Sequence, residues 1–237
     1  MANAAIFLCA GSGTRMRGKV ADKVLTPLGG KPVFWHSVKA FVDSGLTEHA
    51  VIVYRDKEQR IELAKVLGDL NVEHWNIAWV AGGKERQDSV FNGLSEVSLL
   101  VDYVFIHDCA RPMIRPENIQ ALYDAALQDN AAVLAHRVAD TIKRAAGSQR
   151  KTTARRLKDV PRSNLWAMET PQVFHRETIL ESYRRLRLAN ESVTDDTAAY
   201  SREGHKVTLV ENPYPNPKLT TPADLPYLEF LLQQKSS

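Results

Sequence analysis

The sequence contains only two cysteines, Cys9 and Cys109, among 237 residues. Two thiols cannot form the disulfide framework of a small secreted protein, so we expect a reducing, cytoplasmic environment. Long apolar runs are also missing, because even residues 4–10 are far shorter than the ~20 residues needed to span a membrane. The N-terminus lacks the basic segment of a signal peptide. We therefore expect a cytoplasmic protein with no membrane partner.

Several catalytic and metal-binding motifs are also missing. The seven histidines show no metal-ligand spacing, and neither HExxH nor CxxC occurs. The chain has no G-K-[ST] sequence of a P-loop, and no arrangement of nucleophile, histidine and acid is evident. These absences disfavour zinc chemistry, P-loop hydrolysis and a covalent intermediate. Charge stabilisation at a phosphate remains as the favoured chemistry.

Apolar runs alternate with amphipathic stretches along most of the chain. Residues 4–9 form a continuous apolar run, as in a buried parallel strand, and residues 33–42 carry apolar side chains at helical spacing. The alternation predicts βαβ units, a mostly parallel sheet and an α/β class, within a single domain spanning 1–237. We expect further strands at 50–54, 77–80, 103–107, 131–135 and 206–210, and helices at 56–67, 89–97, 116–127, 176–188, 195–202 and 222–232.

The pattern changes at Val138. Residues 140–159 have little apolar content, and we expect a protruding β-arm at about 138–162. Residues 143–162 contain eight Lys or Arg and one acid, a net charge of +7, so the remaining residues carry −4. Basicity is therefore local, and the arm lacks the aromatic residues that stack on single strands, so we expect no nucleic-acid partner. The arm is either a solvated surface or a segment that reaches toward phosphates.

The loop after the first expected strand reads Ala10-Gly11-Ser12-Gly13-Thr14-Arg15-Met16. Its glycines allow the backbone to approach a phosphate, with exposed N–H groups as an anion cradle. Arg15, and Lys23 eight residues later, add two cations that suit a triphosphate. A dinucleotide-binding oxidoreductase is disfavoured, because Met16 replaces the third glycine and Arg55 follows the second strand where an acid is required. An ordinary tight turn is the structural alternative.

Three other segments carry candidate site residues. Asp108 ends an expected strand, where ligands bind in open parallel sheets, and its carboxylate can hold Mg²⁺ against phosphate oxygens. His107 precedes it and points to the opposite face, so we expect a packed histidine. Gly82-Gly83 with Ser89 could approach a nucleobase edge-on, or could form a common strand-to-helix turn. Lys218 precedes a proline-started helix and carries no functional signal alone.

In this order the segments resemble the 2-C-methyl-D-erythritol 4-phosphate cytidylyltransferase family of the non-mevalonate isoprenoid pathway. The resemblance covers nearly the whole chain, and its specificity comes from the ordered set. The matching segments are AGSGTRM at 10–16, Lys23, the turn at 27–32, GGxERxDSV at 82–90, HDCARP at 107–112, DTIK at 140–143, Arg162 with Leu165-Trp166, TPQ at 170–172, TDD at 194–196 and Lys218-Leu219-Thr220.

The resemblance implies a Rossmann-like core with helices on both faces and an arm that clasps a second subunit in a homodimer. It implies transfer of CMP from CTP to 2-C-methyl-D-erythritol 4-phosphate with release of pyrophosphate, assisted by Mg²⁺. The implied catalytic residues are Arg15, Lys23 and Lys218, and the implied nucleotide contacts are Ala10, Gly11, Gly13, Gly82, Gly83, Arg86 and Ser89. The implied substrate contacts are Asp108, Arg111, Thr141, Arg162 and Thr170, with Asp108 also the metal ligand.

The sequence departs from the family pattern at the segment before Lys218. Pro215-Asn216-Pro217-Lys218 replaces D-N-I-K and removes a carboxylate credited with helping the metal. Magnesium would then rest on Asp108, phosphate oxygens and water, which is acceptable because Mg²⁺ usually takes one or two protein carboxylates. A ribitol-5-phosphate cytidylyltransferase tolerates the same loss and is the nearest alternative. A non-catalytic nucleotide- or RNA-binding protein is a third possibility. The DTIK segment and Arg162 favour the erythritol substrate.

Overall fold

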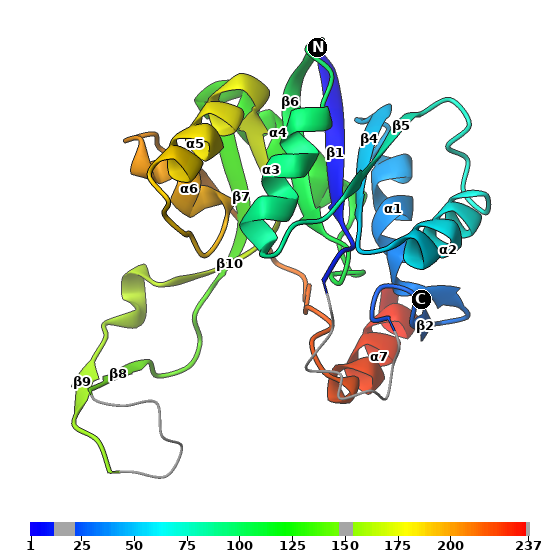
Figure 1. Cartoon of the computed structure of the whole chain (residues 1–237). Helices are drawn as coiled ribbons and strands as arrows, with labels where there is room; N and C mark the ends of the chain where they lie inside the picture. The colour runs from blue at the N-terminus through cyan, green and yellow to red at the C-terminus, as the bar shows by residue number, and fades with distance from the viewer. Residues whose placement is uncertain (12–21, 147–153, 236–237) are drawn as a thin grey trace.

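The computed structural model describes residues 1–11, 22–146 and 154–235 (Figure 1). Its centre is a seven-stranded sheet in the order β11-β7-β10-β6-β1-β4-β5. The strands of this sheet are β1 (Ala2–Leu8), β4 (His49–Tyr54), β5 (Asn76–Ala81), β6 (Val101–Asp108), β7 (Ala131–Arg137), β10 (Trp166–His175) and β11 (Thr208–Glu211). The expected strands and the mostly parallel sheet are confirmed.

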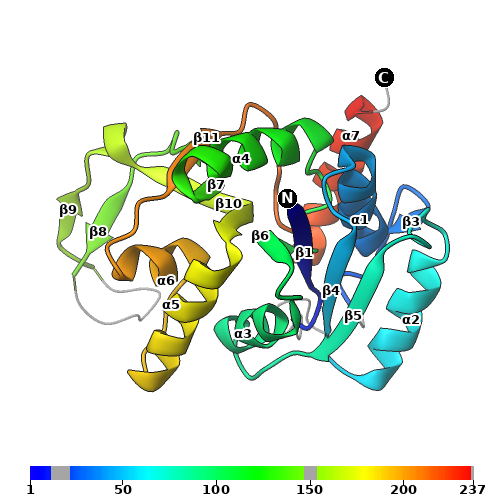
Figure 2. The ribbon, with the colours of Figure 1, turned by 90° about the horizontal axis from the view of Figure 1, so that it is seen from above.

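Helices cover both faces of the sheet, as Figure 2 shows from above. The face of α1 (Val33–Ser44), α2 (Lys57–Leu67) and α4 (Pro116–Asp129) holds one apolar cluster, around Phe7, Phe41 and Phe105. The opposite face, beneath α3 (Arg86–Glu96), α5 (Arg176–Leu188) and α6 (Asp196–Arg202), holds a second cluster with Ile6 and Phe174. Alternate side chains of each strand point to opposite faces, which is why neighbours such as Ile6 and Phe7 belong to different clusters.

A smaller unit beside the carboxyl ends of the parallel strands contains a short hairpin, β2 (Pro27–Leu28) and β3 (Lys31–Pro32), and helix α7 (Leu225–Lys235), which follows a 3-10 turn at Pro222–Asp224. Leu28, Val33 and Leu228 form a third apolar cluster that joins the hairpin to α7. Among the described residues, no helix is both long enough and apolar enough to cross a membrane.

The sequence did not predict β10, which lies between β7 and β6 and runs antiparallel to both. The polar sequence Glu169-Thr170-Pro171-Gln172 interrupts its apolar residues, and proline normally avoids central strands. The pairing with β7 shifts register between Met168 and Gln172, so this polar stretch forms an irregularity where a proline is tolerated.

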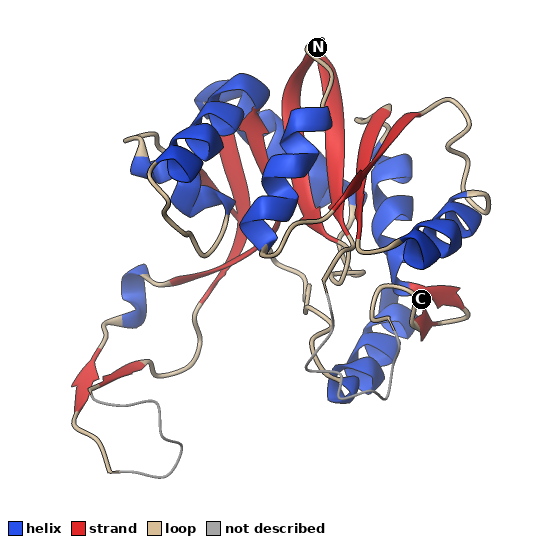
Figure 3. Ribbon diagram, in the orientation of Figure 1, coloured by secondary structure: helices blue, strands red, loops and turns tan. Residues whose placement is uncertain are grey.

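The basic arm begins after the last residue of β7 and rejoins the sheet at the first residue of β10 (Figures 1 and 3). It contains the short antiparallel pair β8 (Lys143–Ala145) and β9 (Leu157–Asp159), all of whose residues are exposed, and a 3-10 turn at Arg162–Asn164. Because β7 and β10 are adjacent and antiparallel, the arm is an extended connection between two neighbouring strands of the core sheet.

Candidate active site

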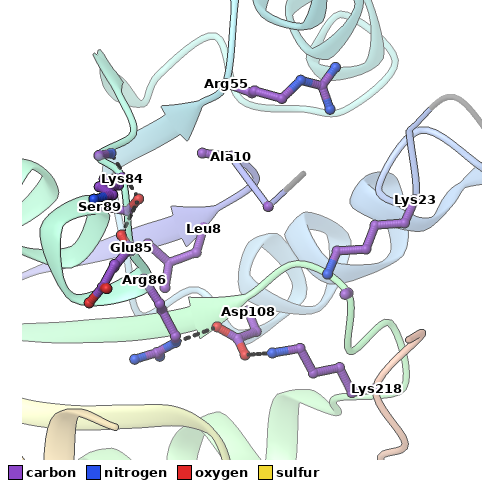
Figure 4. A pocket seen from close by; sticks show the side chains of 13 residues that line it. Leu8, Ala10, Lys23, Arg55, Lys84, Glu85, Arg86, Ser89, Asp108 and Lys218 are labelled. Carbon is purple, nitrogen blue, oxygen red and sulfur yellow. Dashed lines mark hydrogen bonds and ion pairs between the residues drawn. The ribbon is translucent and has the colours of Figure 1, made fainter. Parts of the chain in front are cut away.

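A cavity of about 410 Å³ opens where β1, β5 and β6 end (Figure 4). These strands are parallel, so their carboxyl ends meet at one edge of the sheet, where ligands bind in open α/β folds. Five of the described lining residues are cations and two are acids. The lining consists of Leu8, Ala10, Gly11, Lys23, Arg55, Gly83, Lys84, Glu85, Arg86, Ser89, Asp108, Ala110 and Lys218. This excess of positive charge suits a polyanionic ligand.

Asp108 lies at the centre of this charge distribution. Arg86 Nε donates to its Oδ1 at 3.1 Å, and the Lys218 ammonium pairs with its Oδ2. Burial alone would raise the pKa of Asp108, but the charges of Arg86 and Lys218 outweigh burial and hold that pKa well below its usual range. Asp108 is therefore an anion at any physiological pH, with both oxygens engaged by cations.

Arg86 is held from its other side by a residue to which the sequence had given no role. Asp196, at the first position of α6, is fully buried and accepts from Arg86 Nη1 at 3.0 Å and Nη2 at 2.8 Å. The Tyr183 hydroxyl donates to the same carboxylate at 2.5 Å. Burial would lower the pKa of Arg86, but Asp196 and Asp108 raise it well above its usual value. Arg86 is thus a fixed cation linking α3, α6 and the end of β6.

Lys23 reaches the cavity from the segment before the β2–β3 hairpin. A Cβ placed on Gly11 would lie 3.4 Å from both Cε and Nζ of Lys23, so the end of the Lys23 side chain lies beside the loop that follows β1. Asp22 anchors this segment, because its carboxylate accepts from Gln59 Nε2 at 2.6 Å and from the backbone N–H of Val24 at 3.0 Å. Its Oδ2 also lies 3.0 Å from Arg55 Nη1.

The paired glycines permit close packing between two loops. A Cβ on Gly82 would lie 2.4 Å from the Cβ of Ala10, and one on Gly83 would lie 2.2 Å from the Cβ of Asp88. The Ser89 hydroxyl accepts from the N–H of Gly83 at 3.0 Å, which fixes the turn into α3. The amino end of α3 therefore faces the cavity, where its dipole favours an anion.

The predicted substrate contacts do not gather in one place. Asp108 lines the cavity, whereas the Thr170 hydroxyl is buried and accepts from the N–H of Asp108 at 3.0 Å. Arg111 lines a second cavity of about 380 Å³, and its Nη1 donates to the carbonyl of Asn216 at 2.7 Å. Thr141 and Arg162 belong to the arm and do not line the first cavity. Gly13 and Arg15 lie outside the described residues.

His107 is packed, as the strand alternation predicted. Its ring is fully buried against Phe41, with ring centroids 5.6 Å apart, and Nδ1 lies 3.2 Å from the Thr170 hydroxyl. Burial lowers the pKa of His107 to about 3. The neutral imidazole thus supports the end of β6 and takes no part in acid–base chemistry at neutral pH.

The donor set of the cavity is compatible with a divalent metal ion that binds together with phosphates. Among residues 1–11, 22–146 and 154–235, no group of three or more His, Cys, Asp or Glu side chains could hold a metal ion. Asp108 supplies one buried carboxylate at the cavity wall, and Mg²⁺ usually binds through one or two carboxylates together with phosphates and water. A divalent metal ion held by Asp108 would therefore share its oxygens with Arg86 and Lys218, which already pair with them.

The sheet and its cationic cavity define an α/β protein with a site suited to a polyanionic ligand. The model of the 2-C-methyl-D-erythritol 4-phosphate cytidylyltransferase family matches residues 3–234. A protein of that name from Caldanaerobacter subterraneus subsp. tengcongensis is 38% identical over 233 residues, covering 97% of this chain and 98% of the relative. One from Geobacillus thermodenitrificans is 36% identical over 231 residues, covering 98% and 97%.

Solved structures agree with these relatives. The crystal structure of the 2-C-methyl-D-erythritol 4-phosphate cytidylyltransferase of Francisella tularensis is 25% identical with a TM-score of 0.77, covering 98% of this chain and all of that one. A 4-diphosphocytidyl-2C-methyl-D-erythritol synthase from Anaerococcus prevotii, 24% identical, shares the fold with a TM-score of 0.84 and covers 98% of both chains. The chain belongs to the 2-C-methyl-D-erythritol 4-phosphate cytidylyltransferase family, which is a family of nucleotidyltransferases.

Proposed function

We propose that this chain transfers CMP from CTP to 2-C-methyl-D-erythritol 4-phosphate and releases pyrophosphate, in the cytoplasm, as a step of isoprenoid precursor synthesis. The observation that carries the proposal is the set of fixed cations around Asp108, in a cavity at the carboxyl ends of parallel strands. The identity of the nucleotide and of the acceptor is inferred from family membership, because the cavity alone does not specify them.

In the proposed reaction, an oxygen of the acceptor's phosphate monoester attacks the α-phosphorus of CTP, and the bond to the pyrophosphate leaving group breaks. Negative charge increases on the α-phosphoryl oxygens and on the leaving group. Lys23 and Lys218 point into the cavity from opposite segments and would offset that charge, with Arg15 as a third cation. The monoester is already an anion, so no general base is required. Mg²⁺, held by Asp108, would polarise phosphate oxygens.

The roles of Ala10, Gly11, Gly82, Gly83 and Ser89 as cytosine and ribose contacts belong to the same proposal. Ala10, Gly11, Gly83 and Ser89 line the cavity, and Gly82 packs closely against Ala10, which supports a base bound between β1 and α3. Arg86 is engaged by two carboxylates, which supports an indirect role, in which Arg86 fixes Asp108.

The acceptor is proposed to bind beside Asp108, with Arg111 and Thr170 close to it and with Thr141 and Arg162 supplied by a second copy of the chain. The arm supports this arrangement, because it extends away from its own sheet and exposes Leu157, which is 61% accessible (Figure 1). A homodimer would cover the exposed arm and bring its cations to an anionic substrate.

Pyrophosphate release measures the proposed function directly. We expect release with CTP, Mg²⁺ and 2-C-methyl-D-erythritol 4-phosphate, and much less with ribitol 5-phosphate or with ATP. Lys23→Met should lower kcat by about 10²- to 10³-fold, because one cation at the reacting phosphates is lost. Lys57→Met, at an exposed position of α2, is the matched control. Preference for ribitol 5-phosphate, or full activity of Lys23→Met, would overturn the corresponding part of the proposal.

A further inference from the structure

Glu169 is a buried carboxylate that lines the second cavity, of about 380 Å³, and not the first. It belongs to β10, is 2% exposed, and has hydrogen-bond partners at both oxygens. Oε2 accepts from Asn212 Nδ2 at 3.0 Å and from Asn216 Nδ2 at 2.8 Å, and Oε1 lies 2.6 Å from Nδ1 of the half-exposed His136. Burying a carboxylate is costly unless hydrogen bonds compensate it, so this cluster needs an explanation beyond core packing.

The two asparagines belong to the segment that carries Lys218. Residues 212–221 lie in neither helix nor strand, and prolines at 213, 215 and 217 cannot donate backbone hydrogen bonds. Backbone hydrogen bonds hold the segment at Asn212, to Ala135, and at Leu219, to Ala110, and between them side chains hold it. Asn216 donates to Glu169 and to the carbonyl of Thr170 at 3.2 Å, and its own carbonyl accepts from Arg111.

Lys218 follows Asn216 after a single proline. Its ammonium pairs with Asp108, and the next residue, Leu219, donates its N–H to the carbonyl of Ala110 at 2.7 Å. The backbone is thus fixed on both sides of Lys218. Before Lys218 it is held by the bond from Asn216 to Glu169, and after Lys218 by the bond from Leu219 to Ala110, which follows β6. Pro217 restricts the backbone between them, so a displacement at Asn216 moves Lys218.

We propose that Glu169 is a positioning residue for Lys218, acting through the side chain of Asn216. This inference rests on the proposed function, in which Lys218 offsets charge at the reacting phosphates. Glu169 lines the second cavity with Arg111 and does not line the first, so the route by which it would act on Lys218 is the Asn216-Pro217-Lys218 segment. A displacement of about 1 Å at a reacting group can cost about 10²-fold in rate.

The test is a double-mutant cycle between Glu169 and Lys218. Glu169→Leu should lower kcat by about 10- to 100-fold in the wild-type background and by little in a Lys218→Met background, because the ammonium it positions is already gone. Equal losses of kcat in both backgrounds would overturn the proposal, since a general structural defect adds to the loss of Lys218. A folded Glu169→Leu protein with wild-type kcat would overturn it as well.

Three further variants separate the link through Asn216 from other effects. Glu169→Gln should recover most activity, because the amide oxygen of glutamine can take the place of Oε2 and accept from Nδ2 of Asn212 and Asn216. His136→Ala leaves both asparagine bonds intact and should leave kcat unchanged. If Glu169→Leu does not fold, Asn216→Ala keeps the carboxylate and should reproduce the loss of kcat. The opposite result for His136→Ala or Asn216→Ala contradicts the proposed link.

The reactivity of the Lys218 ammonium group can also be measured without substrates. Acetylation by an amine-reactive ester, quantified by peptide mass spectrometry, should be faster at Lys218 in Glu169→Leu than in the wild type, with Lys57 as an internal reference. An unchanged rate would overturn the proposal. If the wild type releases no pyrophosphate from any polyol phosphate, the proposed function fails, and this acetylation experiment alone decides the role of Glu169.

Discussion

Arg86 and Asp196 form a two-point ion pair, with Nη1 and Nη2 at 3.0 and 2.8 Å from the two carboxylate oxygens, although 110 residues separate them in the sequence. The pair fixes the plane of the guanidinium, so that Nε is directed at Asp108. The orientation of the candidate metal ligand therefore depends on a residue of α6 that does not line the cavity.

Asp196→Asn should destabilise the protein by about 3 kcal/mol, because it leaves the buried end of Arg86 without its counter-charge. The KM for CTP should rise as Asp108 loses its fixed neighbour. Urea unfolding and initial-rate kinetics measure the two effects. Tyr183→Phe is the matched control, since it removes one hydrogen bond to Asp196 and should cost only about 1.5 kcal/mol. Wild-type stability of Asp196→Asn would contradict the importance of the pair.

Lys218→Met should strengthen the binding of Mn²⁺, used as a probe for Mg²⁺, to the nucleotide-free protein. The Lys218 ammonium occupies one oxygen of Asp108, and its removal frees that oxygen and removes a repelling charge. We expect at least about tenfold tighter binding, measured by electron paramagnetic resonance of free Mn²⁺. Lys84→Met removes a positive charge elsewhere in the cavity wall and should have a smaller effect. Equal effects of the two variants would argue against Asp108 as the metal contact.

Protonation of His107 should contribute to acid unfolding. Its pKa is about 3 in the folded protein and 6.5 when exposed, so between these values the unfolded state binds more protons. Stability from this group is complete above pH 6.5 and is lost as the pH falls toward 3, with a slope of about 1 kcal/mol per pH unit. His107→Asn should flatten the pH dependence of the unfolding free energy between pH 4 and 6.5. An identical slope in both proteins would contradict the assignment.

Leu157→Asp should weaken the proposed homodimer, because it adds a charge to an exposed apolar position of the arm. Sedimentation equilibrium should show a dimer for the wild type and a shift toward monomer for the variant. The KM for the polyol phosphate should rise more than the KM for CTP, since the arm is proposed to contact only the acceptor. Leu188→Asp, at an exposed position outside the arm, is the control. A monomeric wild type would refute the dimer.

Much of this fold could be predicted from local patterns in the sequence. The apolar runs at β1 and β6, together with the glycines after β1, were sufficient to place Asp108 at the carboxyl edge of a parallel sheet. Strand β10 was not predictable in this way, because Pro171 and its polar neighbours disguise a strand that is buried between β7 and β6.

The residues that support the site from outside the cavity were harder to predict from the sequence. Asp196 was noted only within a matching motif, and Glu169 gave no signal, since their partners lie far away in the sequence. A long-range ion pair or a buried carboxylate leaves no periodic pattern, so only the folded chain reveals it. Lys23 was identified from its position after the glycine loop, whereas Lys218 was identified through the family resemblance, and both line the same cavity.

The cavity draws its lining from β1 through to the segment beyond β11, so no contiguous part of the chain can form it alone. Ligand binding therefore reports on the folding of the whole sheet. If β11 detached from β7, the segment after β11 would also carry Lys218 away from the cavity. A cytidine nucleotide that binds only the intact sheet would raise the melting temperature in proportion to the logarithm of its concentration. Thermal shift with nucleotides thus offers a direct screen for ligands of this site.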